Sequence, residues 1–107
     1  MSSDSSAYIV GAYEHETRLA PDKSVAQLHA ECAIGALNDA GLSLSDVDAY
    51  FCAGDAPGTA PMWMADYLNL KLSWFDGTEA GGCSYLAHIQ RASAAIATGQ
   101  CKVALKP

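Results

Sequence analysis

Residues 78–101 read TEAGGCSYLAHIQRASAAIATGQC, and this stretch decides the fold. Its glycine pair permits a tight turn between a strand and a helix, and Gly99 can adopt the left-handed conformation that closes a helix. We expect a helix over residues 84–98, with one strand before it at 71–75 and another after it at 101–107. The stretch therefore predicts a strand–helix–strand unit, and such units build parallel sheets.

The sequence upstream alternates in the same way. The short, apolar and β-rich segments at 7–12 (AYIVGA) and 49–54 (AYFCAG) predict two more strands. Helices are expected over residues 24–40 and 62–70, the second after a loop rich in glycine and proline. The resulting order, β-α-β-α-β-α-β, predicts an α/β fold with a largely parallel sheet that is buried on both faces.

The first expected helix carries clear signals at both ends. Ser24 and Gln27 have the spacing of a capping box, and Gly41 is placed to close the helix. Apolar residues recur at spacings of three and four, so one face is expected to meet the core. That face consists of Val25, Leu28, Cys32 and Ala36.

Composition limits the classes of function. The chain has 107 residues, a formal net charge of −6 and 50% apolar residues, which suits one domain with a single core. The six Lys and Arg residues form no cluster, so no nucleic-acid partner is expected. No apolar run approaches the roughly 20 residues of a membrane span, and the first residues do not resemble a signal peptide. The four cysteines lack a C-x-x-C pair, so we expect no disulfide framework, no metal site and a cytoplasmic location.

Cys83 is the first candidate catalytic residue. A helix start can lower the pKa of a thiol and make it nucleophilic. Gly81 and Gly82 would let a substrate carbonyl approach backbone N–H groups that can hold an oxyanion. The alternative is that Cys83 is a small residue packed where a helix meets a sheet.

Three neighbouring side chains are candidates for proton transfer or substrate contact. His88 lies one turn into the helix, either as the base that a nucleophilic cysteine needs or as a buried, hydrogen-bonded residue. Glu79 precedes the glycine pair, either as a base or as a cap of the turn. Tyr85 is placed with them as a candidate substrate contact.

Two blocks of the sequence resemble the thiolase superfamily. The first runs from the strand at 7–12 through a helix with small residues and leucines between Leu28 and Leu37, and continues through Ala40–Leu42 (AGL) and Asp46–Asp48 (DVD). The second, AGGCSYLAHIQRASAAIATGQCKVAL, is similar to the nucleophile helix of that family and the strand after it. The resemblance is greatest to the lipid-transfer-protein-like branch, often described as acetyl-CoA acetyltransferases.

The resemblance implies an enzyme of acyl-CoA thioesters. Members of this family join or cleave carbon–carbon bonds beside the thioester carbonyl, with a cysteine at the start of that helix as acyl acceptor. They stack two similar halves in an αβαβα sandwich and pair into dimers. Residues 1–107 would then be the truncated N-terminal portion of a thiolase-like domain, inactive without the half that supplies a histidine and a second cysteine. CoA is expected only as part of the substrate, and the expected protein partner is a second copy or a partner thiolase subunit.

The register of the second block leaves the mechanism open. The distance from Cys83 to Gly99 is one residue shorter than in the family, so a gapless match places Gly82 at the nucleophile position and Tyr85 at a glycine of the motif. Acyl transfer through Cys83 is the first hypothesis. The second is retro-aldol cleavage of a β-hydroxyacyl-CoA in lipid or steroid side-chain degradation, with Cys83 a bystander. A non-catalytic dimerising subunit, or a chain cut short by a frameshift, are the remaining alternatives.

Overall fold

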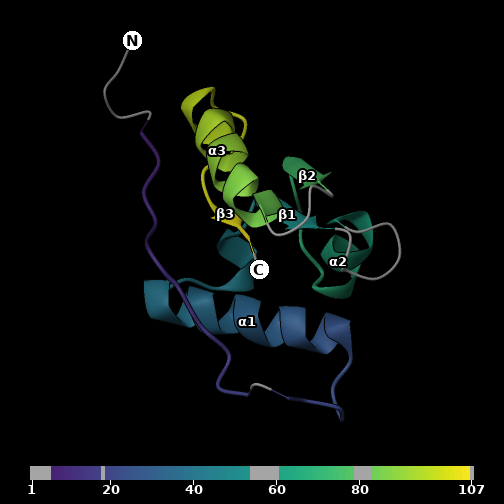
Figure 1. Cartoon of the computed structure of the whole chain (residues 1–107). Helices are drawn as coiled ribbons and strands as arrows, with labels where there is room; N and C mark the ends of the chain where they lie inside the picture. The colour runs from purple at the N-terminus through teal and green to yellow at the C-terminus, as the bar shows by residue number, and fades with distance from the viewer. Residues whose placement is uncertain (1–5, 18, 54–60, 79–82, 107) are drawn as a thin grey trace.

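The computed structural model describes residues 6–17, 19–53, 61–78 and 83–106. In chain order the elements are α1 (Val25–Ala40), the short 3-10 helix η2 (Leu44–Asp46), β1 (Ala49–Ala53), α2 (Pro61–Tyr67), β2 (Trp74–Thr78), α3 (Ser84–Ala97) and β3 (Ala104–Leu105). The strands of the described residues form one parallel sheet in the order β2-β1-β3. The predicted α/β class and parallel sheet are therefore confirmed (Figure 1).

The central strand β1 is buried along its whole length and supplies both cores. Tyr50 and Cys52 pack on one face of the sheet with apolar side chains of α1 and α2. Ala49 and Phe51 pack on the other face against α3. Because successive side chains of a strand point to opposite faces, this apolar run can fill two layers at once, as its composition predicts.

The amino ends of the strands are held together around Asp48. Its carboxylate accepts hydrogen bonds from the Lys102 N–H at 2.9 and 3.0 Å and from the Val103 N–H at 2.9 Å. Ser73, which precedes β2, donates its hydroxyl to the Gln100 carbonyl oxygen at 2.8 Å. These contacts fix the starts of β2 and β3 beside β1, so the register of the whole sheet is set at this end.

α1 begins and ends where its sequence signals predict. The Ser24 hydroxyl accepts a hydrogen bond from the Gln27 N–H at 3.0 Å, and Gly41 closes the helix with φ at 73°. The capping box is only half formed, because the Gln27 side chain donates to the Glu31 carboxylate at 3.0 Å instead of reaching back. A nearby carboxylate is the stronger acceptor for that amide.

The face of α1 that meets the sheet differs from the predicted one. Ala26, Ala33 and Leu37 are buried in the core, whereas Val25 is 46% exposed. The predicted stripe lies on the flank of the helix and ends at Ala36, which the N-terminal segment covers. The helix therefore has two apolar sides, and periodicity in the sequence does not distinguish which one the sheet will take.

Residues 7–12 form no strand, so that prediction is wrong. The segment instead lies across α1, close enough that a Cβ atom on Gly11 would overlap the backbone of Ala36 and one on Gly35 would overlap the ring of Tyr13. The Ala12 N–H donates to the Asp39 carboxylate at 2.9 Å. We call residues 11–17 the strap; Figure 1 shows this part of the chain crossing α1 before it turns back into the helix.

The strap replaces sheet pairing for a physical reason. Small residues on α1 let the backbone of the strap approach the helix closely. The Asp39 carboxylate accepts from the Ala12 N–H, a donor that would otherwise pair within a sheet. The apolar side chains just before the strap stay at the surface as a result. Tyr8 and Ile9 are each 78% exposed, and Val10 is 65% exposed.

Several element boundaries also move from their predicted positions, and the last strand, expected over residues 101–107, is limited to Ala104–Leu105. α2 ends at Tyr67, because Asn69 adopts φ at 56° and the Leu70 N–H returns to the Ala65 carbonyl oxygen at 2.8 Å. β2 begins at Trp74 rather than at residue 71, after the Ser73 N–H has been taken by the Asp48 carbonyl oxygen at 2.8 Å. The shifts of α2 and β2 come from backbone hydrogen bonds that the side-chain pattern does not record.

Candidate active site

The carboxyl ends of the parallel strands form the candidate site. α3 begins at this end of the sheet, after the segment that follows β2, and β1 lies between β2 and β3. In open α/β sheets, ligands bind outside the carboxyl ends of the strands. Cys83, Tyr85 and His88 lie at the start of α3 or within its first turns. The other three predicted site residues, Glu79, Gly81 and Gly82, lie outside the described residues, as does the side chain of Tyr85.

Cys83 directly precedes α3, and its side chain is exposed. The interpretation of Cys83 as a packed core residue is therefore wrong. The helix that it precedes is 14 residues long, and the N-terminus of such a helix carries a partial positive charge. An exposed cysteine at this position can act as a nucleophile or stand beside a substrate without reacting.

His88 is fully buried on the face of α3 that meets the sheet. Its ring lies against the ring of Phe51 in β1, with the centroids 6.1 Å apart and the planes tilted by 42°. Burial lowers the pKa of His88, and the positive charges of Lys106 and Arg91 lower it further, against the opposing effect of Asp76. The imidazole is therefore held in its neutral form near pH 7, which is the form that can accept a proton.

The charged side chains around His88 come from both outer strands and from α3. Asp76 of β2 is the register partner of Phe51, so both side chains lie on the α3 face of the sheet. The Arg91 guanidinium donates to the Asp76 carboxylate at 2.7 Å and ties α3 to β2. Lys106 directly follows β3, and burial lowers the pKa of its ammonium group.

Ser84 is a buried polar residue of this site that the sequence did not single out. It is fully buried at the first position of α3, four residues before His88, so the two side chains lie on the same side of the helix. Arg91, Asp76 and Lys106 were also missed. The spacing of Ser84 and His88 could have indicated their burial. They lie four residues apart on the same side of α3 as the small residues Ala92 and Ala95, which face the sheet.

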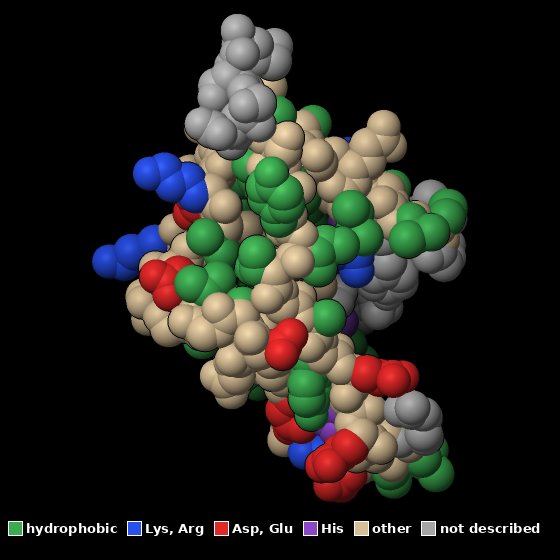
Figure 2. Space-filling view, turned by 90° about the vertical axis from the view of Figure 1, so that its left-hand side faces the viewer, with side chains coloured by type: hydrophobic (Ala, Val, Ile, Leu, Met, Phe, Trp, Pro, Cys, Tyr) green, Lys and Arg blue, Asp and Glu red, His purple; other side chains and the backbone are tan. Residues whose placement is uncertain are grey.

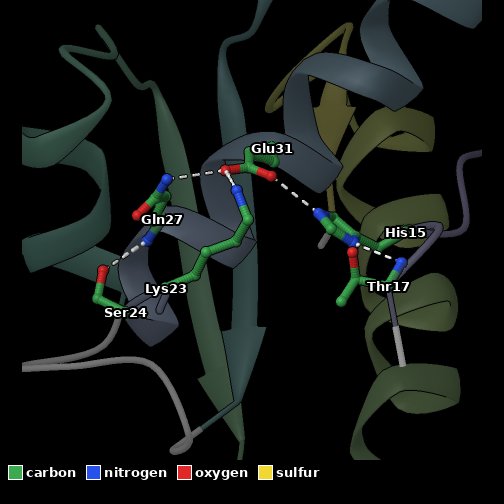
Figure 3. Close-up of polar contacts among 6 residues, drawn as sticks. All are labelled: His15, Thr17, Lys23, Ser24, Gln27 and Glu31. Atoms are coloured by element: carbon green, nitrogen blue, oxygen red, sulfur yellow. Dashed lines mark hydrogen bonds and ion pairs between the residues drawn. The ribbon is translucent and has the colours of Figure 1, made fainter. Parts of the chain in front are cut away.

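A second polar cluster lies on α1, away from the carboxyl ends of the strands. Glu31 accepts hydrogen bonds from the His15 Nε2 at 2.8 Å, the Lys23 Nζ at 2.9 Å and the Gln27 side chain at 3.0 Å (Figure 3). The Thr17 N–H donates to His15 Nδ1 at 3.1 Å, so the proton of the neutral ring is on Nε2. The hydrogen bonds from His15 and then Lys23 are the main causes that lower the pKa of Glu31 to about 2.

This cluster fastens the strap to α1. Its members come from the strap, from the turn before the helix and from the first turns of α1, and none comes from a strand. Figure 2 shows acidic side chains concentrated at the end of the molecule where the strap and α1 lie. We therefore assign the cluster a structural role.

The described residues contain no group of three His, Cys, Asp or Glu side chains arranged to hold a metal ion. In the same part of the chain, no helix combines the length and apolar character that crossing a bilayer requires.

Comparison with known proteins gives one informative result. The sequence matches no protein-family model and no curated protein. Among four similar chains of known structure is one of the Ltp2-ChsH2(DUF35) aldolase, with a TM-score of 0.80 and 28% sequence identity. The similarity covers 95% of this chain but 27% of that one, so the chain spans about a quarter of the aldolase chain.

Proposed function

We propose that this chain is the N-terminal portion of a retro-aldol carbon–carbon lyase of the thiolase superfamily, acting on a β-hydroxyacyl-CoA from lipid or steroid side-chain degradation. The observation that carries the proposal is the similarity to the Ltp2-ChsH2(DUF35) aldolase over 95% of the chain, at a TM-score of 0.80. It favours aldol chemistry over the acyl transfer that the thiolase resemblance puts first. CoA enters only as part of the substrate.

The reaction needs a proton acceptor and a place for negative charge. A base removes the proton from the β-hydroxyl group, and the oxygen then forms a carbonyl as the bond between the α and β carbons breaks. The electron pair of that bond moves to the α carbon and gives the thioester enolate, which hydrogen-bond donors stabilise. Protonation of the enolate releases the shortened acyl-CoA. None of these steps uses a covalent acyl-cysteine.

We assign the proton-accepting role to His88. Among the described residues at this end of the sheet, its imidazole is the group whose pKa burial and neighbouring cations lower, so it is neutral and basic near pH 7. The Phe51 ring packs against the imidazole, which is fully buried. Because the ring is fully buried, the proposal requires that the substrate or an intervening water gain access to it. Cys83, exposed at the start of α3, is then a neighbour of the substrate and not its acyl acceptor.

The test is cleavage of a β-hydroxyacyl-CoA by the whole protein that carries this chain. Formation of acyl-CoA and of the carbonyl product is measured for the wild type and for His88→Gln, Cys83→Ala and His29→Gln. His29→Gln on α1 is the matched control. We expect His88→Gln to lose cleavage by about 10²-fold or more, as removal of a proton-transfer group does, while the other two stay active. The proposal would be contradicted if Cys83→Ala lost cleavage, or if the wild type showed no cleavage.

Acyl transfer through Cys83 is the second candidate function. It is favoured by one observation, the exposed Cys83 side chain at the start of a 14-residue helix. Incubation with an acyl-CoA, followed by mass analysis of the intact protein, separates the two functions. An acyl group trapped on Cys83 and absent from Cys83→Ala supports acyl transfer, whereas an unmodified cysteine in an active protein supports the retro-aldol reaction.

The similar aldolase also suggests a protein partner. Its name couples Ltp2 with ChsH2(DUF35). We therefore expect the whole protein to work together with a second, DUF35-type subunit, and co-purification of the two proteins tests this.

A further inference from the structure

The ion pair between Asp76 and Arg91 lies at the level of His88 on both the helix and the sheet. His88 and Arg91 are three residues apart in α3, so their side chains are neighbours on the helix. Asp76 is the register partner of Phe51, whose ring centroid lies 6.1 Å from that of His88. The Arg91 guanidinium donates to the Asp76 carboxylate at 2.7 Å. Helix and sheet are therefore joined twice at one level, by the two rings and by the ion pair.

The Asp76 carboxylate is held in place by a second hydrogen bond. Its Oδ1 atom accepts from the Gly77 N–H at 2.8 Å, which leaves Oδ2 for the Arg91 guanidinium. The Asp76 side chain is 27% exposed, whereas that of Arg91 is 51% exposed. An ion pair with one partner already ordered loses less side-chain entropy when it forms. The carboxylate is thus a fixed attachment point on β2 for the longer arginine side chain.

The remaining contacts of α3 with the sheet do little to fix the helix in place. Among its described side chains, the buried ones besides His88 are Ser84 and Ala95, with Ala92 and Ile96 packed at the margin of the same core. Most of these side chains are small, and small side chains form low ridges that resist sliding or rotation of a helix weakly. The ion pair to β2 is the directional contact that can set the rotation of α3 about its axis.

We propose that Asp76 and Arg91 are positioning residues for His88: their ion pair holds α3 against β2 and so keeps the imidazole at the position that proton abstraction requires. This inference rests on the retro-aldol function proposed above. A displacement of about 1 Å at a reacting group can slow a reaction by roughly 100-fold, so a small rotation of α3 would be costly. Neither residue of the pair takes the proton itself, and both act through the histidine.

The test follows the contact between the His88 and Phe51 rings by NMR, in the whole protein with labelled histidine and phenylalanine. Arg91→Gln removes the ion pair, and we expect the ring-to-ring contact to be lost and the histidine signals to shift. Arg91→Lys keeps a cation for Asp76 and should keep the contact. Lys23→Gln is the matched control, because it removes an ion pair of 2.9 Å on α1. Asp76→Asn replaces Arg91→Gln if that variant does not fold.

In an active protein, Arg91→Gln should lower kcat by about tenfold or more and change KM little, since a misplaced base slows the chemical step and not substrate binding. Arg91→Lys should retain most of the activity. The inference is overturned if the ring contact of His88 is the same in the wild type and in Arg91→Gln, or if Arg91→Lys loses it as well. This readout needs no turnover. It therefore stays decisive even if the whole protein cleaves no β-hydroxyacyl-CoA, a result that would contradict the retro-aldol function instead.

Discussion

Replacing Gly35 by alanine should have two opposing effects on stability: it favours the helical conformation of α1, and it displaces the Tyr13 ring of the strap. Alanine inside a helix is about 1 kcal/mol more favourable than glycine. The new Cβ, however, would occupy the position of the Tyr13 ring. Tyr13 is 46% exposed, so roughly 100 Å² of its surface is covered, which contributes about 2–3 kcal/mol at ~25 cal/mol per Å². Displacing the ring should therefore leave Gly35→Ala less stable than the wild type by about 1–2 kcal/mol.

A double-mutant cycle separates the two contributions. In a Tyr13→Ala background the collision is gone, and Gly35→Ala should then stabilise the chain by about 1 kcal/mol. The free energy of unfolding in urea is measured for the wild type, both single variants and the double variant. The expected coupling between the two positions is about 2–3 kcal/mol. If Gly35→Ala stabilises the wild type as much as it stabilises Tyr13→Ala, the ring does not lie on this glycine and the description of the strap fails.

Three further predictions concern side chains that titrate or accept hydrogen bonds. Asp48→Asn should lower the free energy of unfolding by about 1.5–3 kcal/mol, because the amide NH₂ that replaces Oδ2 cannot accept from the Lys102 N–H and the remaining oxygen is an uncharged acceptor; an unchanged urea midpoint would contradict this. The pKa of folded His88 is lowered, so its contribution to stability is complete above about pH 6.5 and falls as the pH drops below that value. Thermal melts between pH 7.5 and 5 should show this decline, and His88→Gln should flatten it. The contribution of Glu31 to stability changes with pH in the same direction but at lower pH. It is present above pH 4.5 and is lost as the pH falls towards about 2. Glu31→Gln should remove that acid dependence from the urea midpoint, whereas an unchanged profile would argue against the hydrogen bonds shown for its carboxylate.

The parts of the fold that were predicted correctly depend on local chemistry. Ser24 caps α1 and Gly41 ends it because a hydroxyl and a missing Cβ act within a few residues of their own position. The central strand was equally clear, because an unbroken apolar run such as 49–53 can only be buried on both faces. The segment at 7–12 has a similar apolar pattern, but the strand predicted there does not form. Its backbone approaches α1 through Gly11, and no local pattern records that contact.

The candidate site was predicted in part. Cys83 and His88 became candidates because a strand, a glycine turn and a helix follow one another in the sequence, and that order places the start of the helix at the carboxyl end of a parallel sheet. The exposure of Cys83 and the burial of His88 could not be read from the sequence. They depend on which side of α3 meets the sheet.

By itself, the sequence determined the alternation of strands and helices and the positions of the caps, because each of these follows from short-range periodicity and from turn residues. Only the tertiary structure decided which side of each helix is buried and which charges gather around one ring. Asp76, Arg91 and Lys106 lie on three different elements, and they act on His88 through space because a parallel sheet brings separate carboxyl ends to a single edge.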